Sequence, residues 1–175
     1  MDKPLLCVSA CLAGENVRYD GRSVFHPGLW EFVTEHFTPL PFCPEVEAGL
    51  PVPRQPMDLF DSPLSPRAID RNGEDHTFAL TRVMRAQIRR LCGLPVCGAL
   101  LKSRSPSCAV CRRIPVFDRE TGRACGESFG LFAKMFLAAF EGLPVADEHV
   151  LAGGKAREEF LHAVLARHTF SEDRT

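Results

Sequence analysis

Three short apolar segments of the chain each lead to a cysteine, and this repeated arrangement restricts the fold more than any other feature. The segments are residues 5–10 before Cys11, residues 40–42 before Cys43, and residues 97–101, which lead through a serine-rich loop to Cys108. Apolar runs of this length, bounded by turn residues, predict buried strands. Ligand-binding loops of an open α/β sheet follow the carboxyl ends of its strands, so we expect the three cysteines to share one site.

Helical patterns alternate with these strands. Apolar residues recur at spacings of three and four in four stretches, which predict helices that begin at Pro27, after Asp75, at Ser128 and at Lys155. In the helix that begins at Lys155, we expect Leu165 to pack inward. Strands that alternate with helices predict an α/β fold, with a mostly parallel sheet covered by helices on both faces in a Rossmann-like three-layer arrangement.

The segment between the second strand and the second helix looks different. Residues 44–72 are rich in proline and lack periodicity, which predicts a long, stiff loop without helix that covers another part of the molecule. Residues 113–118 and the turn at residues 120–122 predict an irregular hairpin. Since no repeat or domain boundary is evident, we expect one domain over residues 1–170 and a flexible tail over residues 171–175.

Length and composition narrow the class of protein. A chain of 175 residues can bury a core without disulfides or metal, so its eight cysteines exceed what stability requires. The sequence has neither a secretion signal nor an apolar run of about 18–20 residues, so we expect a cytoplasmic protein without membrane contact. In that reducing compartment, clustered thiols are more often metal ligands or catalytic groups than disulfides.

Charge patterning makes nucleic acid an unfavoured partner. The net charge is −1, so no overall basic field attracts phosphates, and a small or uncharged substrate fits better. One predicted helix carries four arginines, which we assign to a solvated helix face rather than to a binding patch. They are Arg82, Arg85, Arg89 and Arg90.

The cysteines can be divided in three ways. A zinc site could use the C-x4-C and C-x2-C pairs formed by Cys92, Cys97, Cys108 and Cys111. Alternatively, Cys11, Cys43 and Cys108 could bind an iron–sulfur cluster and leave one iron open as a Lewis acid. In the third division, the cysteines are buried packing residues or include one reactive thiol. Their spacing alone does not separate these alternatives.

Residues beside three of the cysteines favour the cluster. Glu45 follows Cys43 by two residues and is placed to act as a general base, although a surface loop carboxylate would look the same. Ser105 and Ser107 precede Cys108, where their hydroxyls could donate to the cluster or hold a substrate oxygen. The hypothesis depends on the convergence of thiol, carboxylate and hydroxyl at neighbouring strand ends.

Three sequence blocks resemble domain-of-unknown-function family 523, whose characterised members are bacterial thiouracil desulfidases. The resemblance covers residues from about 5 to 140. The first block is Ser9-Ala10-Cys11-Leu12-Ala13-Gly14 together with Val17-Arg18-Tyr19-Asp20-Gly21. The second is Cys43-Pro44-Glu45-Val46-Glu47-Ala48-Gly49-Leu50-Pro51-Val52-Pro53-Arg54, and the third is Leu101-Lys102-Ser103-Arg104-Ser105-Pro106-Ser107-Cys108.

The resemblance implies a site and a reaction. It implies that Cys11, Cys43 and Cys108 hold a 4Fe-4S cluster, that the fourth iron binds the sulfur of a thiolated pyrimidine, and that Glu45 and Ser105 serve the chemistry. Water would replace sulfur without a redox change. Residues 130–134 resemble a subgroup often fused to a second domain thought to help bind RNA, and we expect the present chain to act without it. Ala109 stands where the family usually has glycine.

Two classes of function remain as expectations. As an enzyme, the protein would act on a thiolated nucleobase or nucleoside, with thiolated tRNA a less favoured substrate. As a binding or sensor module, it would hold zinc or an iron–sulfur cluster without turnover.

Overall fold

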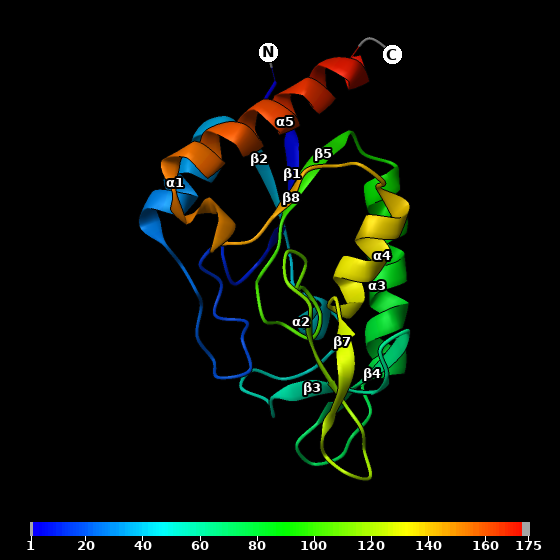
Figure 1. Ribbon diagram of the computed structural model, residues 1–175. Helices are drawn as coiled ribbons and strands as arrows, with labels where there is room; N and C mark the ends of the chain where they lie inside the picture. The colour runs from blue at the N-terminus through cyan, green and yellow to red at the C-terminus, as the bar shows by residue number, and fades with distance from the viewer. Residues whose placement is uncertain (1, 173–175) are drawn as a thin grey trace.

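The computed structural model describes the backbone of residues 2–172 and the side chains of residues 2–169 (Figure 1). Within this range, the central sheet contains four parallel strands in the order β2-β1-β5-β8. Their bounds are Leu5–Ser9 for β1, Thr38–Phe42 for β2, Val96–Leu100 for β5 and Val145–Ala146 for β8. The three strands predicted from the cysteine-terminated segments are therefore adjacent and parallel.

Helices cover both faces of this sheet (Figure 1). On one face, Leu6 and Val8 of β1 pack with α1 (Pro27–His36) and α5 (Gly154–Glu172). On the other face, Cys7 and Ala99 belong to the core that α3 (Thr77–Cys92) and α4 (Leu131–Ala139) complete. This arrangement confirms the predicted α/β fold, because alternate residues of each strand point to opposite faces.

A second sheet lies beyond the carboxyl ends of the first, in the order β4-β3-β6-β7 among the described residues. The bounds are Met57–Ser62 for β3, Ser65–Asp70 for β4, Ile114–Phe117 for β6 and Ala124–Ser128 for β7. The antiparallel pair β6 and β7 is the irregular hairpin that the sequence predicted, with a register shift between Val116 and Phe117.

The prediction of a helix-free loop over residues 44–72 was wrong. This segment contains the short helix α2 (Pro44–Glu47) and the antiparallel hairpin of β3 and β4. Two of its prolines occupy positions that regular structure tolerates: Pro44 opens a helix, and Pro66 lies in β4, the edge strand of its sheet. Proline content therefore obscured two regular elements.

Helix ends differ from the predictions at a few positions. Ser128 does not cap α4; it ends β7, and Gly130 is the N-cap residue. Asp75 accepts a hydrogen bond from the Thr77 N–H at 2.9 Å, although His76 is the N-cap residue of α3. Leu165 is 41% exposed rather than packed inward, whereas Phe160 and Val164 on the same helix are buried.

The four arginines of α3 are exposed, as predicted. At the C-terminus, α5 extends through Glu172, and residues 173–175 of the expected tail lie outside the described part of the chain.

Candidate functional site

A cavity of about 750 Å³ opens at the carboxyl ends of the central strands. Cys11 follows β1, Cys43 follows β2, and Cys108 belongs to the loop after β5, and all three line this cavity. The predicted convergence of the three cysteines at one sheet edge is therefore present in the structure. Parallel strands produce this result because their carboxyl ends lie at the same edge.

The three thiols are shielded from solvent and lie close enough to influence one another. Burial raises the pKa of Cys11 to about 12 and is also the main cause of raised pKa values at Cys43 and Cys108. The charges of Cys11 and Cys43 raise the pKa of Cys108 further, whereas a hydrogen bond with the Ser9 hydroxyl opposes the shift. Buried thiols of this kind become thiolates when a metal compensates their charge.

The four cysteines of the zinc alternative do not converge. Cys92 is exposed at the end of α3, and Cys97 packs in the core beneath α1 and α5. Cys111 interacts with Asp147, and neither residue lines the cavity. Across the described residues, no group of three donors within 4.8 Å of one another includes a cysteine, so the cysteines do not form a compact single-ion site.

The loop that carries Cys108 is held by the start of α4. The N–H of Leu131 donates to Pro106 O at 2.9 Å, and the N–H of Phe132 donates to Ser107 O at 2.8 Å. These bonds satisfy helix N–H groups that have no partner within the helix. Ala109, at the position usually occupied by glycine, is fully buried and is not among the described residues with positive φ. Alanine is therefore compatible with the loop.

Glu45 is fixed by contacts from two directions. It lies in the first turn of α2, and Arg54 donates to its Oε2 from Nε at 2.8 Å and from Nη2 at 2.6 Å. The Ser107 hydroxyl donates to Oε1 at 3.0 Å. The Glu45 and Arg54 side chains are only 12% and 6% exposed, so the pair is largely desolvated. Such charge-assisted hydrogen bonds fix the position and orientation of the carboxylate.

Arg54 is a site residue to which the sequence analysis assigns no role. Besides Glu45, its Nη2 donates to Val17 O at 2.8 Å, and its backbone N–H donates to Tyr19 O at 2.9 Å. Arg54 therefore connects the loop after Cys11 to the helix after Cys43. Arg54 is the last residue of the second sequence block that resembles the family, but the sequence does not show that it pairs with Glu45.

The two serines flanking Pro106 have different contacts. Ser105 Oγ accepts the N–H groups of Ser107 at 3.2 Å and Cys108 at 3.1 Å, and the residue lines the cavity. Ser107 is instead buried and contacts Glu45. Ser105 thus stabilises the turn that presents Cys108, and Ser107 is the serine that touches the carboxylate.

A buried ion pair forms another part of the cavity wall. Lys102 Nζ donates to Glu148 Oε1 at 2.5 Å, and the Ser103 N–H donates to Glu148 Oε2 at 3.0 Å. Burial opposes ionisation of Glu148, but the hydrogen bonds from Lys102 and Ser103 outweigh it and lower the pKa of the carboxyl group. Glu148 follows β8, a two-residue strand that the sequence did not predict.

The model of one protein family, described as 2-thiouracil desulfurase, matches residues 6–148. This match spans most of the chain and contains Cys11, Glu45 and Cys108 along with the cavity-lining loops.

The chain belongs to the 2-thiouracil desulfurase family.

A solved structure supports the family assignment. It is a thiouracil desulfidase, TudS, described as 4Fe-4S-dependent, and it is 30% identical to this desulfurase family member. The match covers 95% of the present chain and 99% of the TudS chain, with a TM-score of 0.69. A comparison with curated proteins gave no match. No helix within residues 2–172 is sufficiently long and apolar to cross a membrane.

Proposed function

We propose that this protein is a desulfidase that replaces the sulfur of a thiolated pyrimidine with oxygen and uses a 4Fe-4S cluster held by Cys11, Cys43 and Cys108. The observation that carries the proposal is the placement of three thiols, one after each of three strands, around a cavity that Glu45 also lines. Cys11 and Cys108 are buried, and Cys43 is partly buried. Membership of the 2-thiouracil desulfurase family and the similarity to TudS support it.

The donor set suits such a cluster. Cysteine thiolates are the usual protein ligands of iron–sulfur clusters, and three of them leave one iron without a protein ligand. When bound, the cluster would supply a Lewis-acidic iron for the sulfur of the substrate. The Ser9 hydroxyl, hydrogen-bonded to Cys108, would orient that ligand and reduce the charge on its sulfur.

Glu45 is the proposed general base. Its Oε2 is held by Arg54, while Oε1 accepts only from Ser107 among the described residues and retains a lone pair for a water proton. The two hydrogen bonds from Arg54 orient the carboxylate within the cavity wall. The water attacks the ring carbon, and the net reaction converts a thiocarbonyl and water to a carbonyl and hydrogen sulfide without a redox change.

Ser105 is proposed to steady the substrate. Its oxygen accepts two backbone N–H groups, and no described residue accepts its hydroxyl proton. That proton can therefore be donated into the cavity, to a ring oxygen or to the charge that develops as water adds. The same hydrogen bonds fix the oxygen at one position beside Cys108.

The proposed substrate is a free thiolated base or nucleoside rather than thiolated tRNA. The net charge of −1 provides no overall basic field to attract the phosphates of tRNA.

The proposed compartment is the cytoplasm, where the eight cysteines, all free thiols in the structure, remain reduced.

The test is a desulfidation assay with anaerobically reconstituted protein. It compares 2-thiouracil, 4-thiouracil, a thiolated nucleoside and thiolated tRNA at two salt concentrations, and it measures both the oxo product and released sulfide. We expect turnover of a base or nucleoside that depends little on salt. Cluster binding without turnover of any substrate would favour a sensor module, and tRNA turnover that falls steeply with salt would overturn the substrate preference.

A further inference from the structure

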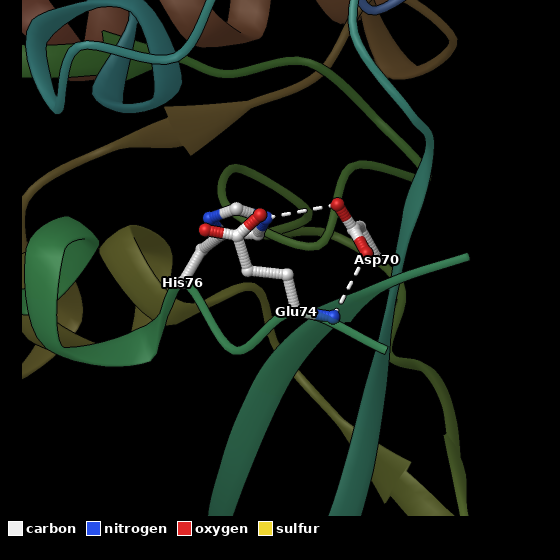
Figure 2. A group of neighbouring side chains, drawn as sticks. All are labelled: Asp70, Glu74 and His76. Carbon is white, nitrogen blue, oxygen red and sulfur yellow. Dashed lines mark hydrogen bonds and ion pairs between the residues drawn. The ribbon is translucent and has the colours of Figure 1, made fainter. Parts of the chain in front are cut away.

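A second group of metal-binding side chains lies at the connection between β4 and α3 (Figure 2). Asp70 is the last residue of β4, Glu74 lies in the turn, and His76 is the N-cap residue of α3. One ligand atom from each of the three residues lies within 4.8 Å of the other two. This group shares no residue with the lining of the large cavity.

Two of the three side chains are buried, and they face each other. Asp70 and His76 are only 9% and 8% exposed, and His76 Nε2 lies 3.1 Å from Asp70 Oδ2. The Glu74 carboxylate lies beside the imidazole ring of His76 (Figure 2), although Glu74 itself is an exposed residue. A nitrogen and oxygens from two carboxylates therefore point to a common space.

The charges in this space are unbalanced. In the described part of the chain, no lysine or arginine forms an ion pair with Asp70 or Glu74, although nearby Asp75 is paired with Arg67. Two carboxylates held close together repel each other unless a cation lies between them.

The backbone holds the group in place. Asp70 Oδ1 accepts the N–H groups of Asn72 at 2.8 Å and Glu74 at 3.0 Å, which leaves Oδ2 to face His76. The turn closes through Gly73, whose φ of 83° favours glycine, and the His76 N–H donates to Ala68 O at 3.0 Å. The ligand atoms thus need little reorganisation to bind an ion.

We propose that Asp70, Glu74 and His76 form a binding site for a divalent cation of the zinc class. One imidazole nitrogen with two carboxylate oxygens is a donor set that zinc accepts, with water in the fourth position. Magnesium and calcium prefer oxygen ligands alone, so the imidazole selects against them. Without an ion, the hydrogen bond between Asp70 and His76 would only hold the turn in place, and the Glu74 carboxylate would take no part in it.

The bound ion would stabilise the β3–β4 hairpin, which contributes to the wall of the large cavity. Asp70 pairs with Met57 in the β-hairpin, and the Arg71 N–H donates to Pro56 O at 3.2 Å. Both Met57 and Pro56 line the cavity. The ion would fix the turn that connects this hairpin to α3, so its effect is on stability and does not depend on the proposed desulfidase reaction.

The test uses protein that carries its iron–sulfur cluster, so that the cluster cysteines are occupied before zinc is added. Zinc affinity is measured by equilibrium dialysis under anaerobic conditions, with zinc and iron determined together, and thermal unfolding is followed with and without zinc. The variants are Glu74→Gln, which alters an exposed residue, and His76→Gln. Glu120→Gln and His162→Gln change exposed residues of the same types elsewhere and serve as controls.

We expect one class of zinc site that raises the melting temperature of the wild type and of both controls. Glu74→Gln and His76→Gln should each weaken binding by at least about tenfold, since even losing an outer partner of a metal ligand typically costs that much. Iron content should not change, and excess magnesium should not displace zinc. Equal zinc affinity in wild type and Glu74→Gln would overturn the proposal, even if His76→Gln failed to fold. Displacement by magnesium would overturn the assignment to the zinc class.

Discussion

The α-carbon of Gly130 lies directly against the main chain of Ser107. A β-carbon at residue 130 would be 2.5 Å from the carbonyl carbon of Ser107 and 2.6 Å from the backbone nitrogen of Cys108. Only glycine permits this approach, and the approach lets the first N–H groups of α4 reach the carbonyls of the cysteine loop. The position of Cys108 therefore depends on a helix that begins more than twenty residues later in the chain.

Replacing Gly130 with alanine should displace the Cys108 loop. Because the obstructing atoms are backbone, the loop or the helix must move, and overpacking of this kind typically costs about 1–3 kcal/mol. Urea unfolding measures the free energy of unfolding, and iron content after reconstitution measures cluster binding. Both quantities should decrease in the variant. Gly153→Ala is the matched control, because no atom lies within 4 Å of a β-carbon there. Equal losses in the two variants would show that the contact with Ser107 is not responsible.

Single replacements of Cys11, Cys43 and Cys108 by alanine should each abolish cluster binding. A thiolate ligand is required, whereas a cysteine outside the cavity contributes only packing or nothing. Iron, sulfide and visible absorbance after anaerobic reconstitution measure the outcome. Cys92→Ala and Cys125→Ala change exposed cysteines and should retain the cluster. If Cys92→Ala removed the metal and Cys11→Ala did not, the zinc alternative would be favoured.

Glu45→Gln should retain the cluster and lower kcat. The amide keeps the shape of the side chain but cannot take a proton from water, and a positioned general base typically contributes about 10²–10⁴-fold. Steady-state kinetics with a thiolated base, together with iron content, separate the two properties. Glu47→Gln changes an exposed glutamate of the same helix and should leave kcat unchanged. Full activity of Glu45→Gln would assign the base to another group.

Glu148→Gln should destabilise the protein near neutral pH but not in acid. Burial opposes ionisation of Glu148, but hydrogen bonds from Lys102 and Ser103 hold its folded-state pKa below the ordinary value. The stabilisation is therefore present above that ordinary value and is lost as pH falls through the folded pKa. Hydrogen bonds to a charged group contribute about 1.5–3 kcal/mol. We therefore expect the unfolding free energy of Glu148→Gln to be lower than that of the wild type by this amount at neutral pH.

The measurement is urea unfolding of metal-free wild type and Glu148→Gln from about pH 3 to pH 7. The difference in unfolding free energy between them should decrease toward the acid end. Glu141→Gln changes an exposed glutamate and should show no such trend. A difference that stayed constant across the range would mean that Glu148 stabilises the fold by packing alone.

The sequence by itself determined the α/β class and the shared location of Cys11, Cys43 and Cys108. Apolar runs and helical periodicity report which residues are buried, and the geometry of a parallel sheet then places successive strand ends together. The roles of the three cysteines, Glu45 and Ser105 remain predictions. Family resemblance, rather than spacing, separated the cluster from the zinc alternative in advance.

The tertiary structure decided the side-chain partnerships and the elements that lack a local pattern. Arg54 with Glu45, Lys102 with Glu148, and Gly130 with Ser107 are contacts between separate elements, and β8 is too short for any periodicity. Local sequence patterns specify backbone preference and burial. Which residue a given side chain contacts depends on how distant segments pack. The hydrogen bonds between such segments become strong when packing removes water from around them.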